Sequence, residues 1–253
     1  MLAHRVLVCL DVRDGRVVKG ARFVDLRDVG DPALLAERYE AEGADEIVLL
    51  DISASSDGRA TLLDTVRRTA ERLFIPLTVG GGVRSVDDVG RVLRAGADKV
   101  AINSAAVARP ELLTESAARF GAQCVVASID ARREGGRWLV WTHGARTRTE
   151  LDAIDWARQC VARGAGEILL TSIDCDGART GYDVALTRAV ADAVPVPVIA
   201  SGGAGEPAHL VVALEAGGAD AVLVAGIVHD GVYSVAACKH ALRVAGRRVR
   251  VSA

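Results

Sequence analysis

Aromatic side chains are scarce in this chain. They make up 4% of its 253 residues, whereas hydrophobic residues of all kinds make up 50%. The apolar content is therefore mostly Val, Ala, Leu and Ile, which suits parallel strands that are covered on both faces of their sheet. Eightfold βα barrels commonly contain about 250 residues in one unit. We therefore expect a single large α/β domain.

Cysteine pairs at metal-binding spacing are lacking, and so is a charge excess of one sign. The five cysteines are an odd number, and no two of them form a CxxC motif. This pattern argues against a disulfide framework and a zinc site, and it favours a reducing cytoplasm. The formal net charge is −2, so no overall basic field attracts nucleic acid. We expect no metal, no cofactor and no nucleic-acid partner.

Long hydrophobic runs are absent as well. No apolar run reaches the roughly 18 residues that a membrane span requires. The opening segment MLAHRVLVCLD is charged at Arg5 and again at Asp11, so it is too short for a signal peptide. We expect a soluble, cytoplasmic protein without a membrane partner.

Short apolar runs alternate with longer amphipathic stretches along the whole chain. Asp31, Pro32 and Gly43 delimit a helix over 31–43, and Ser85 begins another over 85–96. Eight is the number of strands that closes a βα barrel, so we expect a (β/α)8 TIM barrel. The expected strands are 5–11, 46–51, 76–80, 99–103, 124–130, 167–172, 197–201 and 221–226.

The second half of the sequence repeats the first. All four strands of the first half have counterparts, in the same order, in the second half. Chance likeness among Gly- and Ala-rich segments is the alternative, but the similar offsets favour a duplicated half-barrel, with halves of about 1–121 and 122–253. The matching segments are 42–53 with 163–174 and 75–85 with 196–206 (offset 121), 96–104 with 218–226 (offset 122, with an insertion at Gly217–Gly218), and 8–12 with 127–131 (offset 119).

Two carboxylates end equivalent strands of the two halves. Asp11 ends the first expected strand and Asp130 the fifth, and these strands lie opposite each other in a ring of eight. Catalytic residues of this fold lie at the C-terminal strand ends. The pair therefore suits acid and base work on opposite sides of one substrate. The alternative is that both residues cap helices or form loop ion pairs.

Glycine-rich loops follow the other strands. Glycine allows backbone N–H groups to approach an anion closely, and the loops after strands 7 and 8 commonly bind phosphate in this fold. The repeat supplies a second such pair of loops after strands 3 and 4, which predicts a substrate with a phosphate at each end. The alternative is that these glycines only turn the chain. The loop residues are Gly80–Gly82, Asn103–Ser104, Ser201–Gly203 and Ala225–Gly226, and we add Asp51 and Thr171 at neighbouring strand ends as substrate-binding candidates.

Two further segments carry candidate ligand-binding residues. In 169–183, Asp174, Asp176 and Gly177 favour a tight turn that meets phosphate, although a DxDG stretch alone does not make a calcium loop. The segment 9–31 is long for a βα connection, and long loops are usually functional or disordered. Its Lys19 is either a cation carried over the site when the loop closes or a solvated side chain.

A balanced set of charges lies at the opposite ends of the strands. Buried charges need partners, and two bases with two acids can form a ring across the barrel floor. Physical chemistry alone favours a structural layer of salt bridges there. The residues are Arg5, Glu46, Lys99 and Glu167.

These residues together resemble the cyclase subunits of imidazole glycerol phosphate synthases, from histidine biosynthesis. The likeness covers essentially the whole chain. It is carried by CLDV with GRVVKG at 9–20, LRDxGDP at 26–32, FIPLTVGGGVR at 74–84, GADKVAINS at 96–104, GAGEILLTSID at 164–174, DG with GYD at 176–183, and PVIASGGAG at 197–205.

The resemblance implies a reaction and a partner. Such enzymes use ammonia and a bis-phosphorylated ribulosyl carboxamide ribonucleotide, and they release imidazole glycerol phosphate and an aminoimidazole carboxamide ribonucleotide. It implies that Asp11 and Asp130 are the acid–base pair. The floor ring then becomes a gate for ammonia from a glutaminase that docks on the N-terminal face as a heterodimer. The implied phosphate ligands are Gly82, Asn103 and Ser104 for one phosphate, and Asp176, Gly177, Gly203 and Gly226 for the other.

The sequence departs from the family pattern at three places. Cys175 replaces a basic residue, Glu150 replaces a glycine, and GIVHDG at 226–231 replaces an aromatic-flanked His segment. Two other interpretations stay open. One is the sister isomerase of the same pathway, which shares the repeat, the paired aspartates and the phosphate sites. The other is a degenerate barrel that only activates a glutaminase, against which Asp11, Asp130 and Lys19 argue.

Overall fold

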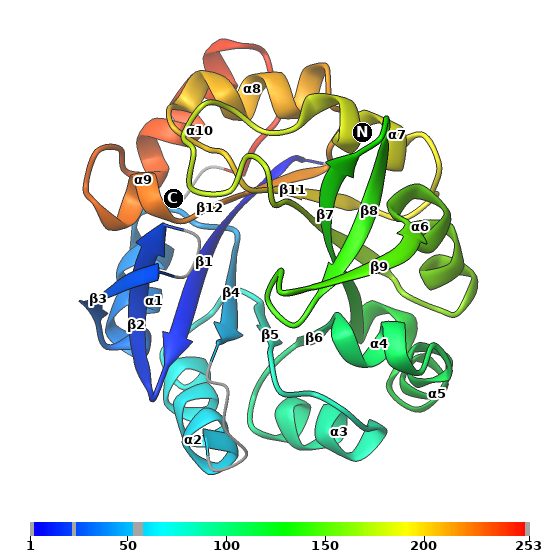
Figure 1. Ribbon diagram of the computed structural model, residues 1–253. Coiled ribbons are helices and arrows are strands. Elements are labelled where there is room, and N and C mark those ends of the chain that lie inside the picture. Colours follow the sequence, from blue (N-terminus) through cyan, green and yellow to red (C-terminus); the bar gives the residue numbers. More distant parts are fainter. Residues whose placement is uncertain (1–2, 22–23, 53–57, 251–253) are drawn as a thin grey trace.

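Eight parallel strands form a closed barrel (Figure 1). The computed structural model describes residues 3–21, 24–52 and 58–250. Each barrel strand pairs with the next, and the last pairs with the first, so the predicted (β/α)8 TIM barrel is confirmed. In ring order the strands are β1 (Arg5–Arg13), β4 (Glu46–Asp51), β5 (Leu77–Gly80), β6 (Lys99–Ile102), β7 (Val125–Glu134), β10 (Glu167–Ser172), β11 (Val198–Ser201) and β12 (Ala221–Val224).

Several strands are shorter than the sequence predicted. Pro76 and Pro197 lie just outside β5 and β11 because proline has no N–H to donate to a ladder, although each carbonyl accepts a bond from the neighbouring strand. Gly226 is not the end of a strand, as expected, but the first residue of a short helix. These differences do not change which strands form the barrel.

Helices follow the barrel strands and surround them (Figure 1). Asp31 and Ser85 cap α1 and α3, as predicted, because each side chain accepts bonds from N–H groups of the first helical turn. No helix within the described ranges is long and apolar enough to cross a membrane. The helices are α1 (Pro32–Ala41), α2 (Gly58–Ala70), α3 (Val86–Arg94), α4 (Ser104–Ala108), α5 (Glu111–Phe120), α6 (Ala153–Ala162), α7 (Val184–Ala191), α8 (Pro207–Glu215), α9 (Gly226–His229) and α10 (Val235–Val244), with a 3₁₀ turn η1 (Ala122–Cys124) before β7.

Two antiparallel hairpins stand on the rim of the barrel, and the sequence did not predict them. β2 (Arg16–Ala21) and β3 (Val24–Gly30) pair with the end of β1, while β8 (Arg137–Thr142) and β9 (Thr147–Asp152) pair with the end of β7. The segment 9–31, expected as one long loop, therefore contains a hairpin. β1 and β7 extend beyond the barrel wall and offer free ladder groups, which the hairpins satisfy. Residues 22 and 23 of that segment lie outside the described residues.

Side chains alternate between the helix layer and the barrel interior. The larger core lies between strands and helices and contains most of the buried apolar residues, including Leu10, Tyr39 and Ile129. The interior of the barrel holds a separate, smaller apolar cluster, which includes Cys9 and Ala101. Both ends of the interior are polar, so this apolar layer separates the mouth, at the C-terminal strand ends, from the floor, at the N-terminal ends.

Corresponding contacts recur in the two halves of the sequence. Ile47 N donates to Pro76 O, and Ile168 N donates to Pro197 O, both at 3.0 Å. The two donors and the two acceptors each differ by 121 positions, which is the offset of the sequence repeat. The boundary between halves near residue 121 stays a prediction. On the floor, His4 forms a parallel bridge with Val249.

Candidate active site

Asp11 and Asp130 lie at opposite positions of the barrel mouth. They occupy β1 and β7, which are four places apart in the ring of eight strands. Burial is the main cause that raises the pKa of each carboxyl group to about 7. Two carboxyl groups that titrate near neutral pH can each donate or accept a proton during a reaction.

A third carboxylate, Asp176, couples the pair. After burial, the negative charge of Asp176 is the next cause that raises the pKa of both Asp11 and Asp130. The pKa of Asp176 is itself raised by burial, while the N–H of Gly177 lowers it. The turn containing Asp176 is closed by its own N–H, which donates to Ser172 O at 3.0 Å. The expected turn after β10 is therefore present and faces the pair.

The two aspartates have different hydrogen-bond partners. Asn103 Nδ2 donates to Asp130 Oδ2 at 2.8 Å. The thiol of Cys9 donates weakly to Asp11 Oδ1 at 3.8 Å. Each of these bonds lowers the pKa of its carboxyl group against the larger effect of burial. Thr171 lies directly beside Asp130 in the ladder between β7 and β10.

His229 is a neutral imidazole that bonds the backbone of β1 and the side chain of Tyr39 in α1. Its Nε2 lies 2.9 Å from Cys9 O, and its Nδ1 lies 2.7 Å from the hydroxyl of Tyr39. A carbonyl only accepts, so Nε2 carries the hydrogen and Nδ1 accepts from the tyrosine. Burial lowers the pKa of His229 to about 4. This chain of bonds fixes the part of β1 that carries Asp11.

In the glycine loop after β5, the backbone of Gly81 lies close to the backbone of Asp51. A Cβ on Gly81 would lie 2.1 Å from Asp51 O, and Gly81 has a φ of +94°. Gly82 has a φ of +65°, but a Cβ there would contact nothing within 4 Å, so this side of the loop is open. The loop leads into the cap of α3, where Ser85 and Asp88 bond each other.

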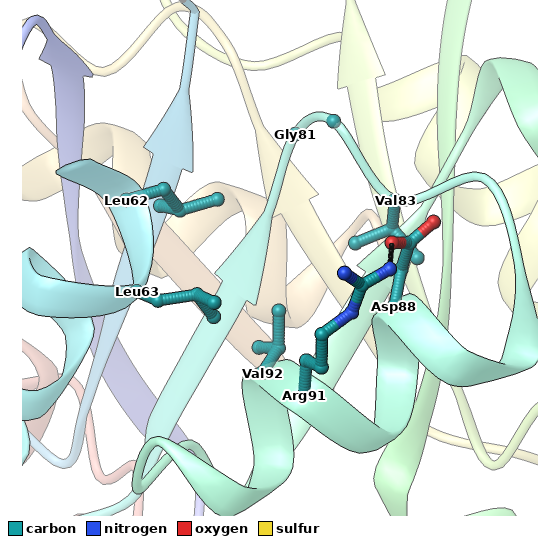
Figure 2. Close-up of a pocket in the computed structure, with 8 residues that line it drawn as sticks. Leu62, Leu63, Gly81, Val83, Asp88, Arg91 and Val92 are labelled. Carbon is teal, nitrogen blue, oxygen red and sulfur yellow. Dashed lines mark hydrogen bonds and ion pairs between the residues drawn. The ribbon is translucent and has the colours of Figure 1, made fainter. Parts of the chain in front are cut away.

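Figure 2 shows a small hollow behind this loop, between α2 and α3. Arg91 bonds Asp88 across its edge at 2.6 Å, and its wall is mainly apolar. The hollow lies between the helices α2 and α3, and neither Asp11 nor Asp130 lines it, so we assign no chemistry to it. Its lining residues are Leu62, Leu63, Gly81, Gly82, Val83, Asp88, Arg91 and Val92.

The loop after β11 matches the loop after β5. A Cβ on Gly202 would lie 2.7 Å from Ser172 O, just as one on Gly81 would meet Asp51 O. A Cβ on Gly203 would lie 2.0 Å from Gly181 O, and its φ is +109°. Both positions therefore require glycine. Ser201, before them, is the last residue of β11.

Three cations converge on one carboxylate beside Gly226. Lys19 Nζ donates to Gly226 O at 3.1 Å and to Asp230 Oδ2 at 2.5 Å. Arg27 and Arg179 also bond the carboxylate of Asp230. This cationic cluster, made of Lys19, Arg27, Arg179 and Asp230, carries three positive charges and one negative charge. The remaining charge of +2 matches a phosphate monoester dianion.

The four charged residues at the floor form a closed ring. Glu46 accepts from Arg5 at 3.0 Å and from Lys99 at 2.8 Å. Glu167 also bonds Lys99, at 2.8 Å, and Arg5. Thr78 Oγ1 donates to Glu46 Oε1 at 2.6 Å. The ring is thus balanced in charge and spans the interior of the barrel.

The structure therefore brings the expected residues to the two ends of the barrel. The mouth holds the aspartate pair, its glycine loops and the cationic cluster, and the floor holds the charged ring. Ser104 lies under the second hairpin, because its hydroxyl accepts from His143 N at 2.9 Å. Sequence reasoning did not single out Arg27, Arg179 or Trp141. Arg27 stands in the quoted LRDxGDP motif, which was the available signal.

Comparison with known proteins agrees with this geometry. The sequence profile described as "Histidine biosynthesis protein" matches residues 5–234. The chain is 71% identical over 250 residues to the imidazole glycerol phosphate synthase subunit HisF of Myxococcus xanthus (strain DK1622), and the match covers 99% of each chain.

Proposed function

The chain belongs to the histidine biosynthesis protein family, and from that premise we propose that it is the ring-closing subunit of an imidazole glycerol phosphate synthase. It uses ammonia to convert a bis-phosphorylated ribulosyl aminoimidazole carboxamide ribonucleotide into imidazole glycerol phosphate and an aminoimidazole carboxamide ribonucleotide. The full-length likeness to a named synthase subunit supports this activity.

One observation carries the proposal for the mechanism. Two carboxyl groups with pKa values near 7 stand on opposite walls of the mouth. Ring closure needs proton removal from the attacking nitrogen and proton delivery to departing oxygen, so a pair that can exist as one acid and one base fits it. Asp11 and Asp130 are the catalytic pair in this proposal.

The two phosphates bind on opposite sides of that pair. On one side, the open loop at Gly82 and the start of α4 at Asn103 and Ser104 take one phosphate. On the other side, Gly177, Gly203 and Gly226 take the second, with Lys19 as its cation. The uncompensated +2 charge of the cationic cluster supports this second site.

A synthase subunit implies a partner that supplies ammonia. We place the glutaminase on the floor, because the charged ring and the apolar interior above it lie on the barrel axis. Arg5, Glu46, Lys99 and Glu167 form the gate, and the interior cluster with its small residues Cys9 and Ala101 forms the conduit.

The test is an assay of the purified chain with the ribulosyl substrate. With ammonium salts at raised pH, ring closure proceeds without any partner, since dissolved ammonia replaces the glutaminase. Glutamine alone gives no product until a glutaminase subunit is added. Absence of ring closure under both conditions would refute the proposed activity.

The same assay separates the two rival functions. A sister isomerase would open a sugar ring and need neither ammonium nor glutamine, so turnover that does not depend on either supports that reading. A barrel that only activates a glutaminase would raise glutamine hydrolysis without forming imidazole glycerol phosphate. Identification of the products therefore decides among the three functions.

A further inference from the structure

Trp141 has a buried indole N–H without an acceptor. Among the described residues, its Nε1 is one of five buried side-chain atoms without a hydrogen-bond partner. A buried donor left unpaired costs free energy, and folded proteins rarely leave one without a reason. The position of Trp141 in the fold gives the reason.

Trp141 lies on the mouth side of β8. It pairs directly with Asp130 in the antiparallel ladder of β7 and β8, and directly opposed residues point to the same side of a sheet. Arg132, two residues beyond Asp130, points to that side as well, and its guanidinium lies 4.4 Å from the centre of the Trp141 ring. The cation therefore covers one face of the indole ring.

The turn of the second hairpin is fixed close to Asn103. His143, two residues after Trp141, donates its N–H to Ser104 Oγ at 2.9 Å. Asn103 in turn holds Asp130 through Nδ2, while its Oδ1 is also buried and has no donor in the described parts of the chain. Trp141 and Asn103 are thus both neighbours of Asp130. The indole N–H of the first and Oδ1 of the second have no hydrogen-bond partner among the described residues.

We propose that Trp141 is a substrate-positioning residue that binds the carboxamide of the ribonucleotide. The indole Nε1–H donates to the carboxamide oxygen, and Asn103 Oδ1 accepts from the carboxamide NH₂. A primary carboxamide carries one acceptor and a donor side by side, which matches the two unpaired atoms. The proposal rests on the proposed function, because that function supplies a substrate with a carboxamide.

The two products of the reaction make a direct test. The aminoimidazole carboxamide ribonucleotide carries the carboxamide, whereas imidazole glycerol phosphate does not. We expect Trp141→Phe, which keeps the aromatic ring and its contact with Arg132, to weaken binding of the first product about tenfold, the usual effect of one hydrogen bond. Binding of imidazole glycerol phosphate stays unchanged. Titration calorimetry on the whole chain measures both dissociation constants.

Trp138→Phe is the matched control. Trp138 lies on the same strand but points to the helix side, where its Nε1 already donates to Asp183 Oδ2 at 3.1 Å. Its substitution removes an indole N–H and leaves both product affinities as they are. In turnover with ammonium, Trp141→Phe raises KM with little change in kcat, because the lost bond also holds the substrate in its ground state.

Three results would overturn the inference. The first is that Trp141→Phe binds the carboxamide product within twofold of the unsubstituted chain. The second is that it weakens binding of both products equally, which indicates only a packing role. The third is that Trp141→Phe and Trp138→Phe weaken binding of the carboxamide product equally. If the unsubstituted chain binds neither product, the proposed function fails as well, so the two failures are distinguishable.

Discussion

At the scale of single residues, the carboxyl groups of the mouth combine strong desolvation with mutual repulsion. Within the described parts of the chain, the hydrogen-bond partners of Asp11 and Asp130 are a thiol and an amide. Because such partners compensate a negative charge only weakly, both groups keep their protons up to about pH 7. Coupled groups titrate as a system, so the acid and the base roles belong to the pair.

Substitution of either aspartate tests the pair. We expect Asp11→Asn and Asp130→Asn each to lower ammonium-dependent ring closure by about 10²-fold or more, since each removes one proton-transferring group. The affinity for inorganic phosphate changes little, because the phosphate loops are intact. Steady-state kinetics and a phosphate titration measure the two effects. Near-normal turnover in either variant would contradict the assigned roles.

Asp176 affects how the stability of the fold depends on pH, because its charge raises the pKa values of Asp11 and Asp130. Because the pKa values of Asp11 and Asp130 are raised to about 7, the folded chain retains protons that the unfolded chain releases between about pH 4 and 7. The free energy of unfolding therefore falls as pH rises through this range. Asp176→Asn removes one repelling charge and makes this fall smaller. We expect the variant to gain about 1 kcal/mol, or a few degrees in Tm, on going from pH 5 to pH 8 relative to the unsubstituted chain.

Thermal unfolding at both pH values measures that gain. Asp155→Asn is the control, because Asp155 is an exposed residue of α6 that pairs with Arg158. A pH dependence of the Asp176 variant equal to that of the control would show that Asp176 does not repel the pair.

Much of the site at this scale was predictable from the sequence. Asp11, Asp130 and the glycine loops could be placed because strand ends and helix starts fix their position in a βα barrel. Arg179 and Trp141 could not, because their contacts join Arg179 to Asp230 and Trp141 to Arg132 through the folding back of separate loops. No local pattern reports such contacts.

At the scale of elements, the two rim hairpins bring side chains to the mouth that the eight barrel strands do not carry. The first carries Lys19 and Arg27 to the loop after β12, and the second carries Trp141 to Asp130. The run RWLVWT over 137–142 is rich in strand-forming residues, so it held a signal for β8. The eight expected strands include none in segment 9–31, so the sequence predicts a loop where the structure has β2 and β3.

The cationic cluster, which joins Arg179 to the first hairpin through Asp230, gives a test of the proposed second phosphate site. We expect Arg179→Gln to raise KM for the bis-phosphorylated substrate about tenfold or more, since it removes one charge-assisted bond to the second phosphate. Arg158→Gln on α6 is the control and leaves KM unchanged, because Arg158 is an exposed residue that pairs with Asp155. Ammonium-dependent kinetics measures both values, and an unchanged KM for Arg179→Gln argues against phosphate binding by the cluster.

At the scale of the whole molecule, two polar ends enclose an apolar interior. The mouth carries the proposed catalytic pair, the floor carries the charged ring, and the interior cluster lies between them. Burial of four charges contributes little net stability, but removal of one of them leaves the others uncompensated. A substitution in the ring therefore affects both stability and the proposed gate, and the two effects have to be measured separately.

Glu46→Gln separates these two roles. It leaves Arg5 and Lys99 without one shared acceptor, and because Glu46 is 1% exposed we expect a loss of about 2–3 kcal/mol in the free energy of unfolding. We also expect glutamine-dependent turnover with a glutaminase to fall more than ammonium-dependent turnover. Glu115→Gln, at an exposed ion pair, is the control and changes neither rate. Equal losses in the two rates would contradict the gate.

The bridge between His4 and Val249 has a topological consequence. It brings the first and last described parts of the chain together on the floor, so the backbone nearly forms a circle. A short linker between its ends, with a new opening near Gly121 before β7, would preserve every neighbour of every barrel strand. Such a circular permutant would begin with the second half and end with the first. The barrel thus depends on the cyclic order of its strands, and β1 is only one of several strands with which this order can begin.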